Sequence, residues 1–236
     1  MDWDQKIYRY CERGHDPAFW AEPFNAISND AFLLAALFAA IAYLRLPRED
    51  RDVVEAGLIV LVAIVGTGSF LFHTFATQWA SLTDVVPIGI FMLVYLGYAL
   101  RRFLALPWLA VAIGLGLFVW ALQAIGNIQC SEPLAMTGTT RGPCFNGSLG
   151  YVPALVAMLA IGAVLTIQRH PAWPYVLSAG VVFLFSLTFR SLDWDICGLT
   201  RLDGHAIGTH FLWHILNSVT LYLLMMGAIR TGRQAR

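Results

Sequence analysis

Hydrophobic residues in this chain are gathered into seven long segments that are separated by polar links. The segments are 25–44, 53–74, 84–100, 107–126, 151–168, 174–192 and 206–228. An α-helix needs about 20 mostly apolar residues to cross the hydrocarbon core of a bilayer. Each segment meets or approaches that length. The pattern therefore predicts an all-α membrane protein, a seven-transmembrane helix bundle that forms a single domain over residues 1–236.

The composition supports a lipid environment. Hydrophobic residues make up 58% of the chain and charged residues 13%, whereas soluble domains carry roughly 25% charged residues. The mean hydropathy of +0.65 leaves too little polar surface to face water. The net charge of zero and the lack of a basic stripe argue against a nucleic-acid partner. Lys6 is the only lysine and precedes the first segment, which excludes a retinal-binding seven-helix protein.

The basic residues favour one orientation, with residues 1–24 as an outer N-terminal tail, 127–150 as an outer loop and a cytoplasmic C-terminus. Nine basic residues then lie on the inner side: Arg45, Arg48, Arg51, Arg101, Arg102, Arg169, Arg230, Arg233 and Arg236. Six lie on the outer side: Lys6, Arg9, Arg13, Arg141, Arg190 and Arg201. In a bacterium, this orientation places the protein in the inner membrane with its outer end facing the periplasm.

Four cysteines, Cys11, Cys130, Cys144 and Cys197, all fall on the outer side in this topology. Disulfides persist in oxidising compartments, so the cysteines agree with the arginine distribution. Four cysteines allow three pairings, which the residues alone do not separate. A Cys130–Cys144 bond would close the long loop, and a Cys11–Cys197 bond would link the tail to the last connection.

Three histidines lie inside the predicted spans, where ionisable side chains are costly and usually functional. His210 and His214 are four residues apart, so both rings lie on one face of a helix. His73 ends the second span, at the end where the seventh begins. Each histidine alone could form an interhelical hydrogen bond, but three at one depth predict a metal site. Three imidazoles and one water form an open zinc site that activates water and polarises a carbonyl.

Two further residues lie close to these histidines in the predicted topology. Asp84 opens the third span and is expected to act as a general base or to orient a histidine ligand. Ser69 lies one turn before His73. Its small side chain could permit close helix packing, or its hydroxyl could stabilise a developing oxyanion. Asp193, Asp195 and Asp203 crowd the last link, where the simplest interpretation is a solvated acidic surface.

Together these motifs resemble those of the alkaline ceramidase family, which belongs to a seven-span superfamily that includes the adiponectin and progestin receptors. The family pattern is Glu-x-x-Asn-x-x-Ser-Asn, Ser-x-x-x-His, an aspartate and a late His-x-x-x-His. The chain matches it at Glu22 to Asn29, at Ser69 with His73, at Asp84, and at His210 with His214. The order and the span positions agree over nearly the whole chain.

The resemblance implies zinc ligands at His73, His210 and His214, catalytic roles for Ser69 and Asp84, and hydrolysis of membrane ceramide to a sphingoid base and a fatty acid. It also implies a Cys11–Cys197 disulfide and a Ca²⁺ site that includes Glu12 and Glu22, although Arg9 stands where the family has an aspartate. The alternatives are a receptor-like protein with a structural zinc site, a hydrolase of another N-acyl lipid, and a transporter.

Overall fold

The fold is a bundle of long helices, seen in a computed structural model that describes residues 2–130 and 142–232. Part of the expected loop 127–150 lies outside the described residues, as do Arg141, Arg233 and Arg236. The α-helices are α1 (Pro23–Ser28), α2 (Asp30–Leu44), α3 (Val53–Phe75), α4 (Gln78–Tyr98), α5 (Trp108–Gly126), α6 (Val152–Ile167), α7 (Trp173–Leu192) and α8 (His210–Thr231).

Short elements connect or extend these helices. They are the helical turns η1 (Arg48–Asp50), η2 (Ala99–Phe103) and η3 (Cys144–Tyr151), and the strands β1 (Gln129–Cys130), β2 (Gly142–Pro143), β3 (Arg201–Leu202) and β4 (His205–Ala206). β1 pairs with β2 and β3 with β4, both antiparallel. Three spans combine two elements each: α1 continues into α2, α4 into η2, and η3 into α6. The described residues therefore contain seven segments that are long and apolar enough to cross a membrane.

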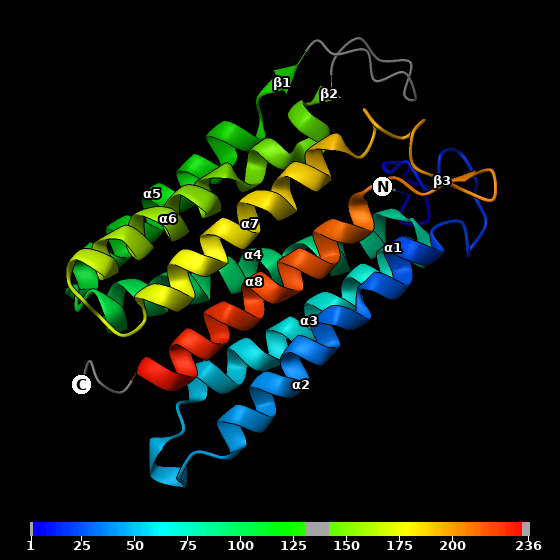
Figure 1. Ribbon diagram of the computed structural model, residues 1–236. Helices are drawn as coiled ribbons and strands as arrows, with labels where there is room; N and C mark the ends of the chain where they lie inside the picture. Colours follow the sequence, from blue (N-terminus) through cyan, green and yellow to red (C-terminus); the bar gives the residue numbers. More distant parts are fainter. Residues whose placement is uncertain (1, 131–141, 233–236) are drawn as a thin grey trace.

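The N-terminal tail and the two strand pairs gather at one end of the bundle, and α8 ends at the other (Figure 1). Helix α8 packs against α2, α3 and α7, and it is the most buried of the seven spans. Helix α5 lies at the periphery and exposes most of its surface. The bundle is therefore organised around α8, which carries two of the three histidines.

Two helices begin at positions other than those predicted. Helix α4 begins at Gln78 instead of 84, because α3 and α4 are joined by only Ala76 and Thr77. Ala76 adopts a left-handed conformation with φ 48°, and its N–H bonds to the carbonyl of Phe72 at 2.8 Å. Asp84 consequently lies inside α4, nearly two turns from its start, instead of opening it. Helix α8 begins at His210 instead of 206, because β4 occupies the preceding residues.

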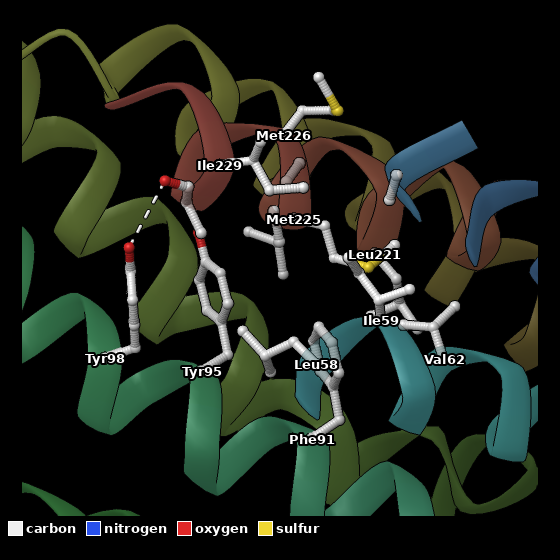
Figure 2. Close-up of a cluster of buried hydrophobic side chains, with 14 of the residues drawn as sticks. Leu58, Ile59, Val62, Phe91, Tyr95, Tyr98, Leu221, Met225, Met226 and Ile229 are labelled. Atoms are coloured by element: carbon white, nitrogen blue, oxygen red, sulfur yellow. Dashed lines mark hydrogen bonds between the residues drawn. The ribbon is translucent and has the colours of Figure 1, made fainter. Parts of the chain in front are cut away.

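An apolar cluster in the half of the bundle away from the tail binds α3, α4 and α8 together (Figure 2). Its labelled members are Leu58, Ile59, Val62, Phe91, Tyr95, Tyr98, Leu221, Met225, Met226 and Ile229. Dense interlocking of this kind resists movement of one helix past another. The cluster thus holds in register the three helices that carry the candidate metal ligands and Asp84.

Two disulfides close connections at the end of the bundle that carries the N-terminal tail. Cys11 pairs with Cys197 and Cys130 with Cys144, across sequence separations of 186 and 14 residues. The described residues contain no free cysteine. The first bond joins the N-terminal tail to the link between α7 and α8, and the second joins β1 to the start of η3. The pairings match the two bonds that the sequence analysis considered.

Removing the Cys11–Cys197 disulfide is expected to destabilise the protein more than removing Cys130–Cys144. The first crosslink closes the much longer loop, and loss of a native disulfide costs about 2–5 kcal/mol. Double serine variants of each pair should be compared by thermal unfolding in detergent. Equal melting temperatures for the two variants would contradict the prediction.

Candidate metal centre

Three buried histidines converge at the end of the bundle that carries the tail. His73 lies in the last turn of α3, while His210 and His214 occupy the first two turns of α8. The centroid of the His73 ring lies 5.3 Å from that of His210 and 4.7 Å from that of His214, and the last two are 4.6 Å apart. One ligand atom from each lies within 4.8 Å of the others. The predicted convergence of these rings is confirmed.

A hydrogen bond to Glu22 orients the His73 ring. His73 Nδ1 lies 2.5 Å from Glu22 Oε2. Because an ionised carboxylate only accepts hydrogen bonds, Nδ1 carries the hydrogen and donates it. The other ring nitrogen, Nε2, is buried and has no hydrogen-bond partner among the described residues. His73 therefore presents a free Nε2 to the cluster.

Ser28 orients the His214 ring in the same way. The Ser28 hydroxyl donates to the carbonyl of Asn25 at 2.9 Å, so its oxygen must act as acceptor toward His214 Nδ1, 2.8 Å away. Nδ1 then carries the hydrogen, which leaves Nε2 of His214 as a lone-pair donor. The Glu22-to-Asn29 motif thus supplies the hydrogen-bond partners of two histidines, from residues at both its start and its end.

The third histidine, His210, is held by its backbone and by an aromatic ring. The Tyr10 ring stacks on its imidazole with centroids 3.7 Å apart, and His210 Nδ1 is buried without a hydrogen-bond partner in the described chain. Buried polar atoms almost always have a partner, so orphaned nitrogens in a cluster of histidines indicate an unseen ligand. Three imidazole nitrogens are a ligand set that suits zinc better than it suits calcium or magnesium.

Arg13 completes the support of this centre from the tail. Its buried guanidinium pairs with Glu22 Oε1 and donates to the carbonyls of His73 (2.8 Å) and Thr74 (3.3 Å) at the end of α3. It also donates to two carbonyls of the tail itself. Burial acts to raise the pKa of Glu22, but the His73 imidazole and the Arg13 guanidinium hold this pKa below its ordinary value. Arg13 thereby keeps Glu22 ionised and fixed beside His73.

Glu12 and Glu22, the two expected calcium ligands, bond to groups of the protein. Asn25 Nδ2 donates to Glu22 Oε2 at 3.0 Å, in addition to the bonds from Arg13 and His73. Glu12 accepts the backbone N–H groups of Phe24 (2.7 Å) and Asn25 (2.8 Å), so it caps the start of α1. Burial raises the pKa of Glu12 to about 7. Within the described residues, neither carboxylate belongs to a group of three or more potential metal ligands.

Asp193 is buried, which corrects the expectation of a solvated acid. Its carboxylate accepts the backbone N–H groups of Cys11 (2.9 Å), Thr209 (2.8 Å) and His210 (3.0 Å). Burial raises its pKa, although these three donors act in the opposite direction. A side chain at Gly208, which has φ 63°, would collide with this carboxylate. Asp193 therefore joins the tail to the start of α8 and places His210.

Asp193→Ala is expected to lower both stability and zinc affinity. The substitution leaves three backbone donors without their acceptor, and each buried unsatisfied donor costs about 1–3 kcal/mol. Thermal unfolding and zinc content of the purified variant measure the two effects. Asp195→Ala is the matched control, because Asp195 is exposed on the same link; equal losses in the two variants would contradict the assigned role.

Ser69 and Asp84 line a polar chamber next to the histidines. Residues of the chamber include His210, His214 and Asn217 from α8. Gly68 brings α3 and α4 together, since a side chain there would collide with the backbone of Thr83. Gly68 thus provides the close helix packing that was considered for Ser69. The Ser69 hydroxyl lies beside the Asp84 carboxylate.

The chamber adjoins a larger apolar cavity between α4, α5, α6, α7 and α8. Four residues line both spaces: Ile88, Tyr151, Trp213 and Asn217. The deeper cavity is bordered by rings and aliphatic chains such as Phe91, Phe118, Phe183 and Leu224. A polar lining thus lies next to an apolar one.

The sequence analysis missed several residues of this site. Arg13 and Arg190 were counted only as outer basic residues, yet both are buried, and Arg190 lines the polar chamber. Ser28 belongs to the recognised motif but had no assigned role. In the sequence, the one sign that Arg190 has a function was its position inside an apolar span.

Comparison with known proteins agrees with the geometry. The model of the ceramidase family matches residues 8–234, which is nearly the whole chain. No curated protein matches the sequence.

Proposed function

The chain belongs to the ceramidase family, and we propose that it is a zinc-dependent intramembrane hydrolase that cleaves ceramide to a sphingoid base and a fatty acid. The observation that carries the proposal is the buried histidine cluster, in which Glu22 and Ser28 leave His73 and His214 with free Nε2 atoms. His73, His210 and His214 would hold the metal. Zinc bound there supplies Lewis-acid polarisation of the amide carbonyl and an acidified water.

Ser69 and Asp84 would carry the proton and charge movements of the reaction. The Asp84 carboxylate accepts a proton from the attacking water and returns it to the amide nitrogen as the C–N bond breaks. The Ser69 hydroxyl donates a hydrogen bond to the carbonyl oxygen as negative charge develops there. Both side chains line the chamber that His210 and His214 border, which is the arrangement these roles require.

The apolar cavity would hold a long chain of the lipid while its amide group occupies the polar chamber. Tyr151, Trp213 and Asn217 line both spaces, so the two lie next to each other. We place the protein in a membrane with its N-terminus outside, and in a bacterium with this end facing the periplasm. Both disulfides lie at the end of the bundle that carries the tail, and disulfides persist in oxidising compartments, which supports this placement.

Hydrolysis of ceramide by the purified protein tests the proposal. Wild-type protein should release sphingoid base, and Asp84→Asn should lower kcat by about 10²–10⁴-fold, the range typical of a lost general base or acid. The zinc content of the variant should stay unchanged, because Asp84 is not one of the three ligands. A panel of other N-acyl lipids distinguishes ceramide from related amides. Bound zinc without turnover on any lipid would favour a receptor-like role.

A further inference from the structure

Arg190 is a buried cation with one side-chain nitrogen that has no hydrogen-bond partner within the described residues. The residue is 6% exposed and lies in the last turn of α7. Its Nη1 donates to the Tyr10 hydroxyl at 3.2 Å, while Nε is buried with no partner among the described residues. A guanidinium carries five N–H donors. Leaving such donors unsatisfied in the interior is costly unless a ligand completes them.

Three aromatic rings lie close to this guanidinium. Its central carbon lies 5.7 Å from the Tyr10 ring centroid and 5.3 Å from those of Tyr151 and Trp213. None of the ion pairs formed within the described residues includes Arg190. Rings stabilise a cation through their negative faces but do not neutralise its charge. The positive charge therefore remains available to an anion.

The charge of Arg190 is directed to the chamber where the reaction is proposed to occur. The chamber is lined by the side chains of Arg190 and Arg9 and by one acidic residue, Asp84. Arg9 is exposed, so it belongs to the water-facing side, whereas Arg190 is buried. Two guanidinium groups and one carboxylate line the chamber, so an anion that enters it can pair with Arg190.

We propose that Arg190, assisted by Arg9, binds an anionic oxygen group on the lipid that occupies the chamber. A planar guanidinium pairs with two oxygens of a carboxylate, phosphate or sulfonate at once. The anion has two potential sources, the carboxylate of the released fatty acid or an anionic headgroup on the substrate. The inference rests on the proposed hydrolase activity and adds to it a subsite for an anionic group of the substrate or product.

Binding of chain-matched ligands tests the anion site without requiring turnover. Palmitate and hexadecanol differ only at the polar end, and each is titrated into detergent-solubilised protein. The wild type should bind palmitate more tightly, and Arg190→Met should reduce that preference by about 10–100-fold. Arg190→Lys should retain part of it. Arg201→Met is the matched control, because Arg201 is exposed at the same end of the bundle.

Hydrolysis distinguishes the two sources of the anion. N-palmitoyl lipids with anionic and with neutral headgroups are compared by kcat/KM in the wild type and in Arg190→Met. A loss of selectivity in hydrolysis assigns the anion to the headgroup, while a loss confined to palmitate binding assigns it to the product. If the variant retains zinc and both preferences are unchanged, the inference is wrong. A wild type that binds palmitate but hydrolyses no lipid would refute the hydrolase activity and leave the anion site standing.

Discussion

Replacing His210 with alanine is expected to remove the metal and abolish hydrolysis. The purified wild type should contain about one zinc per chain, whereas the variant should contain close to none, because two imidazoles hold zinc far more weakly than three. Since each mechanistic role needs the metal, lipid hydrolysis should fall by more than about 10³-fold. Elemental analysis and release of sphingoid base measure the two outcomes on the same sample.

His205 provides the matched control for this experiment. It lies on β4, five residues before His210, and its side chain is exposed and outside the cluster. His205→Ala should keep both zinc and activity. Zinc content that is unchanged in His210→Ala would show that the histidine cluster is not the metal site, and the proposed chemistry would be lost with it.

Arg13→Met is expected to have the largest effect on stability. The substitution leaves the Glu22 carboxylate buried beside His73 without its guanidinium, and breaking one side of a buried ion pair costs about 3–5 kcal/mol. It also removes the donors to the carbonyls of His73 and Thr74 that hold the tail against α3. Zinc affinity should fall by about 10–100-fold, as is usual when the group that orients a histidine ligand is disturbed. Thermal unfolding and zinc titration measure these changes.

A second substitution separates the buried charge from the loss of packing. Arg13→Met combined with Glu22→Gln removes both charges, so it should recover part of the stability lost in the single variant. Arg48→Met serves as the control, because Arg48 is exposed at the other end of the bundle. A single Arg13 variant as stable as this control would contradict the assigned role.

The seven spans could be predicted from hydropathy because the length of an apolar helix depends on the bilayer and little on its neighbours. The errors lie where polar residues occur inside helices. The third span was predicted to begin at Asp84, but in the structure the helix starts at Gln78 and the Asp84 side chain is buried. A polar residue that faces a neighbouring helix cannot be distinguished by sequence from one that faces water.

The three metal-ligand candidates could be predicted from local periodicity and topology together. His210 and His214 share a face because of the helical repeat, and His73 joins them because α3 ends where α8 begins. Their orienting partners could not be predicted in this way. The Asp193 carboxylate accepts the backbone N–H of His210, 17 residues later in the sequence. Glu22 bonds to the His73 ring across a separation of 51 residues. Such pairs depend on how the tail and the last link fold over the bundle.

The sequence by itself determined the helical class, the number of spans and the set of histidines, because hydropathy and helical repeat are properties of neighbouring residues. The tertiary structure decided which nitrogen each histidine presents and which charges are buried beside the cluster. Arg13 and Arg190 show the difference, since the sequence analysis counted both only as basic residues of the outer side. One is paired with Glu22 and supports a ligand, while the other faces the chamber without an acidic partner among the described residues. That distinction comes from packing, which sets the dielectric and the partners of each charge.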